Sequence, residues 1–177
     1  MSSLFVLGGA RSGKSRYAQA RAEAIAGRLI FVATAEARDA EMEERIARHR
    51  ADRDARWMTV DAPYDLPVAI ADHSTTDAVL LVDCLTLWTS NLLLAERDID
   101  AATANLCAAI ARFEGHILLV ANEVGLGIVP DNALARAFRD AAGRLNQKVA
   151  ATADEVVLVT AGLPLTLKAP PPFREQR

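Results

Sequence analysis

The residue pattern with the clearest chemical meaning lies near the amino terminus and reads Gly8-Gly9-Ala10-Arg11-Ser12-Gly13-Lys14-Ser15. It fits G-x-x-x-x-G-K-[ST], with the apolar residues 4–7 before it and a helical pattern after it. In this context the backbone N–H groups of the loop can surround the phosphates of a nucleotide, and the helix N-terminus adds positive charge. Lys14 can reach the β- and γ-phosphate oxygens, and the Ser15 hydroxyl can bind Mg²⁺. The pattern predicts a nucleoside triphosphate site; the alternative is a glycine-rich turn before a helix.

Two carboxylates follow other apolar stretches of the chain. Asp83 comes directly after residues 78–82, and Glu123 lies two residues beyond the stretch 117–121. Parallel strands end at one edge of their sheet, where such folds bind ligands. Asp83 could hold Mg²⁺ beside Ser15 or cap the helix that follows it, and we favour the metal role. Glu123 could orient an acceptor hydroxyl or be a residue of a surface turn, and both interpretations stay open.

The segment 38–56 is highly charged and contains a histidine among arginines. Helical periodicity places His49 on one stripe with Met42, Ile46 and Arg53. Because the apolar face is narrow, we expect this helix to lie over another surface rather than pack deeply. The arginines on either side of His49 suit a phosphate, and a neutral imidazole there could attack phosphorus. The alternative is a solvated helix with Glu–Arg pairs four residues apart.

Apolar stretches alternate with longer helical patterns along almost the whole chain. The expected strands are residues 4–7, 29–34, 57–60, 78–82, 117–121, 156–160 and 165–168, and the expected helices are 14–26, 39–53, 64–72, 85–96, 101–114 and 133–153. Uniformly apolar strands separated by helices predict an α/β fold like that of P-loop NTPases, with a mostly parallel sheet and helices on both faces. We expect an antiparallel C-terminal edge strand. A single nucleotide-binding domain should span residues 1–168, followed by a disordered proline-rich tail at 169–177.

The amino-acid composition excludes several classes of protein. The chain has 177 residues, a hydrophobic content of 51% and a net charge of −3. This balance excludes a non-specific hold on nucleic acid, and no apolar run is long enough for a membrane segment. Cys84 and Cys107 have no metal-type spacing and are too few for a disulfide framework, so we expect buried thiols and a cytoplasmic protein. A cleaved leader is not expected, because its removal would destroy the loop that begins at Gly8.

Taken together, the motifs resemble those of the bifunctional adenosylcobinamide kinase/adenosylcobinamide-phosphate guanylyltransferase family of cobalamin biosynthesis. The resemblance runs from Gly8 to about Lys168. Its motifs are the phosphate loop, Ala33-Thr34-Ala35, the His49 helix, Val82-Asp83-Cys84-Leu85-Thr86, Asn122-Glu123-Val124-Gly125-Leu126-Gly127-Ile128-Val129-Pro130 and Ala142-Gly143-Arg144-Leu145-Asn146-Gln147. The stretch 122–130 and the His49 helix are far more specific than the phosphate loop.

The resemblance implies two reactions. Adenosylcobinamide is phosphorylated with ATP or GTP, and GMP then passes from GTP to the phosphorylated product through a guanylyl group on His49. Lys14 and His49 are the implied catalytic residues, with Mg²⁺ at Ser15 and Asp83. The implied nucleotide contacts are Gly8, Gly9, Ala10, Arg11, Ser12, Gly13, Lys14, Ser15, Ala33, Thr34, Ala35, Arg50, Ala51, Asp52, Arg53, Asp61 and Asp83.

The family also implies a homotrimer, with adenosylcobinamide and its phosphate as small-molecule substrates. One departure follows Arg53, where family members commonly carry a proline and small residues and this chain has Asp54-Ala55-Arg56.

Two other functions fit parts of the pattern. A small-molecule or nucleoside monophosphate kinase could use residues 38–56 as an arginine-rich lid, without a covalent intermediate. A regulatory GTPase is disfavoured, because the chain has no Asn-Lys-x-Asp motif and Asp83-Cys84-Leu85-Thr86 lacks the Asp-x-x-Gly of a γ-phosphate switch.

Overall fold

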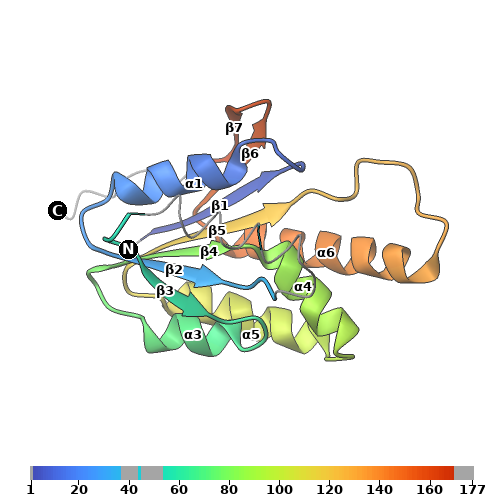
Figure 1. The fold of residues 1–177 in the computed structure, drawn as a ribbon, viewed down its shortest axis with the longest axis horizontal. Coiled ribbons are helices and arrows are strands. Elements are labelled where there is room, and N and C mark those ends of the chain that lie inside the picture. Colours follow the sequence, from blue (N-terminus) through green and yellow to red (C-terminus); the bar gives the residue numbers. More distant parts are fainter. Residues whose placement is uncertain (1, 37–43, 45–53, 170–177) are drawn as a thin grey trace.

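A computed structural model describes residues 2–36, 44 and 54–169 of the chain (Figure 1). Within these residues, a seven-stranded sheet has the order β3-β2-β4-β5-β1-β6-β7. The strands are β1 (Ser2–Gly8), β2 (Arg28–Ala33), β3 (Met58–Asp61), β4 (Ala78–Asp83), β5 (His116–Asn122), β6 (Glu155–Thr160) and β7 (Leu163–Lys168). Neighbouring strands run parallel, except that β7 pairs antiparallel with β6 at the edge. The predicted mostly parallel sheet with an antiparallel C-terminal edge strand is confirmed.

Helices cover both faces of the sheet, as Figure 1 shows. On one face, α1 (Lys14–Glu23) contributes Ala18 and Ala22 to a core with alternate strand residues. The other face carries the helices α3 (Leu66–Asp72), α4 (Leu85–Leu94), α5 (Ile99–Arg112) and α6 (Ala133–Thr152). The central strands are buried on both sides, which is why their sequences are apolar throughout rather than alternating. None of the helices that the structure describes is long and apolar enough to cross a membrane.

The element boundaries differ from the predictions by a few residues, for local reasons. Helix α5 begins at Ile99 rather than residue 101, because the Asp98 side chain accepts a hydrogen bond from Ala101 N and so caps the helix. Helix α3 begins at Leu66, with a proline in its first turn. The expected helix 39–53, apart from Glu44, and the tail beyond residue 169 lie outside the described residues. Cys84 is buried as predicted, whereas Cys107 is only half-buried.

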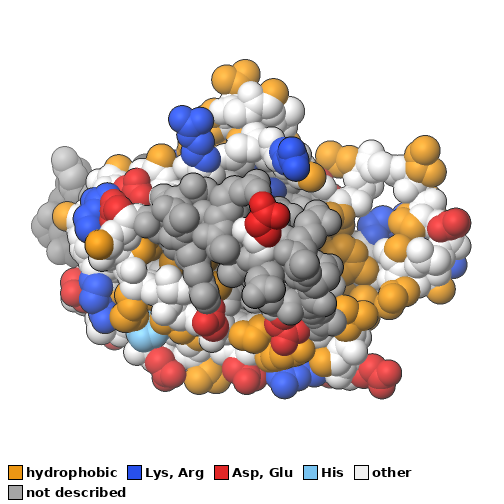
Figure 2. Space-filling view, in the orientation of Figure 1, with side chains coloured by type: hydrophobic (Ala, Val, Ile, Leu, Met, Phe, Trp, Pro, Cys, Tyr) orange, Lys and Arg blue, Asp and Glu red, His pale blue; other side chains and the backbone are white. Residues whose placement is uncertain are grey.

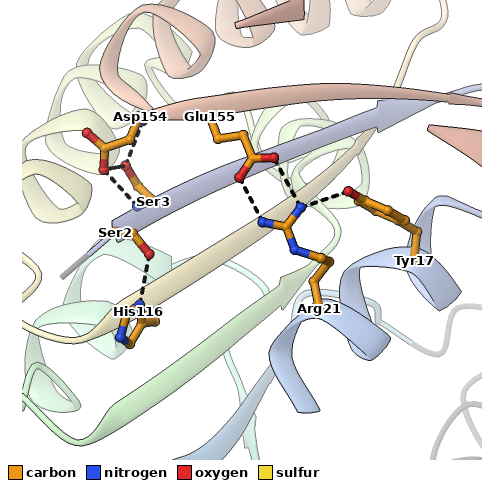
Figure 3. Close-up of polar contacts among 7 residues, drawn as sticks. All are labelled: Ser2, Ser3, Tyr17, Arg21, His116, Asp154 and Glu155. Carbon is orange, nitrogen blue, oxygen red and sulfur yellow. Dashed lines mark hydrogen bonds and ion pairs between the residues drawn. The ribbon is translucent and has the colours of Figure 1, made fainter. Parts of the chain in front are cut away.

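At the amino-terminal edge of the sheet, polar side chains connect α1 and β1 to β6 (Figure 3). The Arg21 guanidinium donates to both carboxylate oxygens of Glu155, at 3.1 and 2.7 Å, and to the Tyr17 hydroxyl at 2.7 Å. The Asp154 carboxylate accepts hydrogen bonds from the backbone N–H and the hydroxyl of Ser3. The bond to Glu155 is the main reason that the pKa of Arg21 lies above its ordinary value. These contacts fix α1 and β1, the two elements that flank the phosphate loop. They do so at the end of the sheet opposite that loop.

His116 should make folding stability depend on pH. Its Nδ1 is hydrogen-bonded to the Ser2 hydroxyl at 2.8 Å (Figure 3). Burial, and then the charge of the chain's amino terminus, lowers the pKa of His116 below 6.5. A histidine whose pKa is lower in the folded than in the unfolded state contributes full stability above its unfolded pKa, and this stability is lost as the pH falls toward the folded pKa.

The check is urea unfolding of wild type and His116→Asn at about pH 7.5 and about pH 5.5. Wild type should lose more free energy of unfolding between the two conditions than the variant, because asparagine binds no proton. An equal or larger loss in the variant would show that His116 does not carry this pH dependence.

Candidate active site

The loop between β1 and α1 has the shape of a phosphate-binding loop. Ser12 N donates to Gly9 O at 3.3 Å, and Tyr17 N donates to Gly13 O at 2.9 Å, which starts the helix. Gly13 occupies the N-cap position with φ +94, where a Cβ would also lie 3.3 Å from Gly162 Cα. Gly162 belongs to the tight β6–β7 turn, and its N–H donates to Ser12 O at 2.9 Å. The loop is therefore supported by the antiparallel hairpin at the end of the chain as well as by its own helix.

Lys14 places a positive charge at the buried side of the loop. The residue is only 8% exposed, and its Nζ donates to Gly9 O at 3.2 Å. A lysine folded back over its own loop keeps its ammonium group at the point where phosphate oxygens would bind. The role of Lys14 in binding phosphate stays a prediction.

Gly8 should tolerate no side chain. A Cβ at this position would lie 2.4 Å from Ser12 Oγ and 2.6 Å from the backbone oxygen of Val159, so the loop or β6 would have to move. We expect Gly8→Ala to lower the free energy of unfolding by about 1–3 kcal/mol, in line with other overpacked sites.

Gly9→Ala is the matched control, because a Cβ there would meet no atom within 4 Å. Thermal unfolding of the two variants should show a lower midpoint for Gly8→Ala and an almost unchanged midpoint for Gly9→Ala. Equal midpoints would contradict the close packing around Gly8.

The carboxyl end of β5 lies directly beside this loop. Gly8 pairs in register with Asn122, and Glu123 N donates to Gly8 O at 3.1 Å. The buried side chains of Thr86 and Asn146 hold this end in place: the Thr86 hydroxyl accepts from Asn122 N at 2.6 Å, and Asn146 Nδ2 donates to Asn122 O at 3.3 Å. Sequence reasoning did not assign these two residues a role. Their signals were a polar residue on the apolar face of each helix and their place in two of the motifs that carry the family resemblance.

Glu123 also has a role in its own turn, because its Oε1 accepts a hydrogen bond from Gly125 N at 2.8 Å. This contact supports the interpretation of Glu123 as a turn residue. It leaves the carboxylate at the same edge as the phosphate loop, where it can still orient an acceptor.

Asp83 is the last residue of β4, and β5 lies between that strand and β1. The strand of Asp83, β4, is therefore two strand spacings, or roughly 10 Å, from β1, which leads into the phosphate loop. Cys84, not Asp83, occupies the N-cap position of α4. Burial raises the pKa of the Cys84 thiol to about 11, with Asp83 acting in the same direction and Lys14 in the opposite one. The Cys84 sulfur therefore lies within electrostatic reach of both Asp83 and Lys14.

Thr34 fixes the geometry around Cys84. It is fully buried, and its hydroxyl donates to Cys84 O at 2.7 Å while accepting from Cys84 N at 2.9 Å. Asn91 Nδ2 donates to Thr34 O at 2.8 Å, which connects α4 to the end of β2. Thr34 therefore joins the ends of β2 and β4. Its neighbours Ala33 and Ala35 are only half-buried and border the same edge.

Asp61 lies at the same level of the sheet but much farther from the loop. Register pairs Ala33 with both Asp61 and Asp83, so the three residues form one row across β3, β2 and β4. Four strand spacings separate β3 from β1, which is roughly 19 Å. Asp61 also lines a shallow cavity of about 300 Å³ with Tyr64 and His73. Asp61 is therefore too far from the phosphate loop to contact the same phosphate as Lys14.

The donor set suits magnesium. Ser15, the second residue of α1, supplies a hydroxyl, and Asp83 supplies a carboxylate; both residues are half-buried. Magnesium is bound in proteins by one or two such oxygen ligands together with substrate phosphates. His49, Arg50, Ala51, Asp52 and Arg53 lie outside the described residues, so their proposed roles depend on the sequence.

Comparison with known proteins identifies the family. Residues 4–167 match the model of the family described as cobinamide kinase / cobinamide phosphate guanyltransferase. The chain belongs to this family. A relative from Pseudomonas aeruginosa, the bifunctional adenosylcobalamin biosynthesis protein CobP, is 44% identical over 94% of this chain and 97% of its own length. The corresponding protein CobU of Salmonella typhimurium is 42% identical over 93% of this chain and 99% of its own length.

Two solved structures with little sequence similarity to this chain share its fold. A protein from Pyrococcus horikoshii OT3 superposes with a TM-score of 0.55 at 8% identity, covering 95% of this chain and 86% of that one. The flagellar accessory protein FlaH of Methanocaldococcus jannaschii gives a TM-score of 0.51 at 13% identity, covering 96% and 79%. These likenesses concern the fold alone.

Proposed function

We propose that this protein phosphorylates adenosylcobinamide with ATP or GTP and then transfers GMP from GTP to the product, giving adenosylcobinamide-GDP. The observation that carries the proposal is the family match along residues 4–167. The formed phosphate loop supports it, because both reactions require a nucleoside triphosphate at one site. The substrates are two nucleotides and a small corrinoid, and we place the reactions in the cytoplasm, where ATP and GTP are made.

In the kinase reaction, the acceptor hydroxyl oxygen forms a bond to the γ-phosphorus of the donor and its proton is released to solvent. The bond between that phosphorus and the bridging oxygen breaks, which releases the nucleoside diphosphate. The protein's main tasks are alignment and stabilisation of charge. The loop N–H groups of residues 8–15 hold the phosphates, and the Lys14 ammonium faces the oxygens that gain negative charge. Mg²⁺, held at Ser15 and Asp83, would neutralise further phosphate charge.

In the transferase reaction, a nitrogen of the His49 imidazole attacks the α-phosphorus of GTP, and pyrophosphate leaves. A phosphate oxygen of the acceptor then attacks the same phosphorus, which breaks the N–P bond and frees the histidine. Arg50 and Arg53, with Ala51 and Asp52, would lie along the nucleotide beside His49. Residues 33–35 and Asp61 are proposed contacts for the nucleotide portion away from the loop.

We further propose that the protein acts as a homotrimer. The sequence of residues 38–56 predicts a helix with a narrow apolar face, and a helix of that kind gains stability when it lies near a neighbouring subunit. Multi-angle light scattering of the full chain tests this, and a monomer mass would exclude it.

Product analysis tests the proposed function. Purified protein incubated with adenosylcobinamide, ATP and Mg²⁺ should form the phosphorylated corrinoid, and GTP should then convert it to adenosylcobinamide-GDP with release of pyrophosphate. Chromatography with mass detection separates the products. Phosphorylation without the second product would favour the small-molecule kinase, and formation of neither product would overturn the proposal.

A further inference from the structure

The connection between β5 and α6 exposes large apolar side chains at the active edge of the sheet. Leu126 is 86% exposed, Ile128 98% and Val129 63%, and Leu134 at the start of α6 is 56% exposed. In Figure 1 this connection arches away from the end of β5, and Figure 2 shows hydrophobic side chains along the same arch. Neighbouring exposed apolar side chains of this size mark a binding surface.

Hydrogen bonds fix both ends of this arch. At its start, Glu123 N donates to Gly8 O at 3.1 Å, which joins the arch to the first residue of the phosphate loop. At its end, Arg136 Nη1 donates to the carbonyl oxygens of Pro130 and Asp131, at 2.9 and 2.7 Å. The start of the arch is thus joined to the nucleotide site, and both of its ends are held by the protein itself, which lowers the entropic cost of binding a ligand.

The chemistry of the arch selects the class of ligand. Residues 124–130 contain no charged side chain, so they cannot hold phosphate groups by charge. A Cβ built on Gly127 would meet no atom within 4 Å, so the backbone between Leu126 and Ile128 faces open space. A bare backbone between two aliphatic side chains suits a broad, flat ligand with a hydrocarbon surface.

We propose that residues 124–130 and Leu134 bind the corrin macrocycle of the acceptor. This inference rests on the proposed function, which supplies a corrinoid as the acceptor. The acceptor oxygen must reach a phosphorus at the phosphate loop, and the bond between Glu123 and Gly8 fixes the start of the arch beside that loop. The arch therefore holds the ring while the arm that carries the acceptor oxygen extends into the site.

The double variant Leu126→Ser/Ile128→Ser tests this assignment. Both residues are so exposed that the change leaves the core intact. Equilibrium dialysis, followed by the visible absorbance of the corrin, measures the Kd of adenosylcobinamide without any turnover. We expect the Kd and the acceptor KM to rise roughly a hundredfold, because each of the two aliphatic side chains, when covered by a ligand, contributes a factor of about ten. The KM for ATP and the extent of labelling by GTP should not change.

Val68→Ser/Leu94→Ser is the matched control, since these residues are 58% and 50% exposed on α3 and α4. It should leave the Kd of the corrinoid unchanged. An unchanged Kd in the arch variant, or an equal rise in the KM for ATP, would overturn the assignment. The assignment would also be overturned if the arch variant lost oligomer mass in light scattering and that loss fully explained its weaker corrinoid binding. The arch would then be an interface between copies of this chain. Failure of the proposed function appears separately, as a wild-type protein that binds the corrinoid but forms neither product.

Discussion

Replacing Lys14 with alanine should lower kcat/KM of both the kinase and the transferase reactions by about 100-fold or more. The Lys14 ammonium is buried against the phosphate loop, with its Nζ 3.2 Å from Gly9 O, and no other lysine lies within the loop. In both reactions, negative charge builds up on phosphate oxygens as the transferred group leaves its donor. Deleting the facing positive charge therefore raises both barriers, whereas a residue specific to one reaction would affect only that one.

Steady-state kinetics of the two reactions, measured separately, provide the check. Lys148→Ala is a suitable control, because Lys148 lies on α6 and pairs with Asp100 on the protein surface at 3.1 Å. It should behave as wild type. Full activity of Lys14→Ala in either reaction would count heavily against a nucleotide site at this loop.

Replacing His49 with alanine should abolish formation of adenosylcobinamide-GDP and leave phosphorylation of adenosylcobinamide largely intact. The covalent route needs an imidazole nitrogen, and alanine offers no nucleophile, so the loss should approach the detection limit. Phosphoryl transfer to a hydroxyl requires no such intermediate. The two reactions should therefore separate in this variant, in contrast to their joint loss in Lys14→Ala.

Quantifying the two products in the same reaction mixture tests this separation. His116→Asn serves as the control, since His116 lies at the start of β5, at the end of the sheet opposite the phosphate loop. It should retain both activities. Retained transferase activity in His49→Ala would remove this residue from its assigned role.

The fold was predictable because β1, β4 and β5 are apolar along most of their length and each is followed by a helix. Burial on both faces of β4 and β5 requires such sequences, and turns or charged residues mark where the strands end. The antiparallel β7 was also expected, although its leucines lie exposed at the sheet edge. The boundaries were harder to predict, since caps such as Asp98 move a helix end by one or two residues.

The candidate site was only partly predictable. The phosphate loop follows from local sequence, because its glycines and Lys14 act within one short segment. The order of the strands does not, so the insertion of β5 between the loop and Asp83 could not be inferred from spacing. Long-range hydrogen bonds, such as those of Thr34 with Cys84 and of Asn146 with Asn122, leave almost no trace in sequence.

The most direct measurement is the intact mass of the protein after incubation with GTP and Mg²⁺ in the absence of acceptor, followed by peptide mapping. Our account predicts the added mass of one GMP moiety on the peptide that contains His49, in a bond that is labile to acid and stable to alkali. Absence of the adduct, or its attachment to any other residue, would contradict a mechanism in which an imidazole attacks a triphosphate held at the loop of residues 8–15.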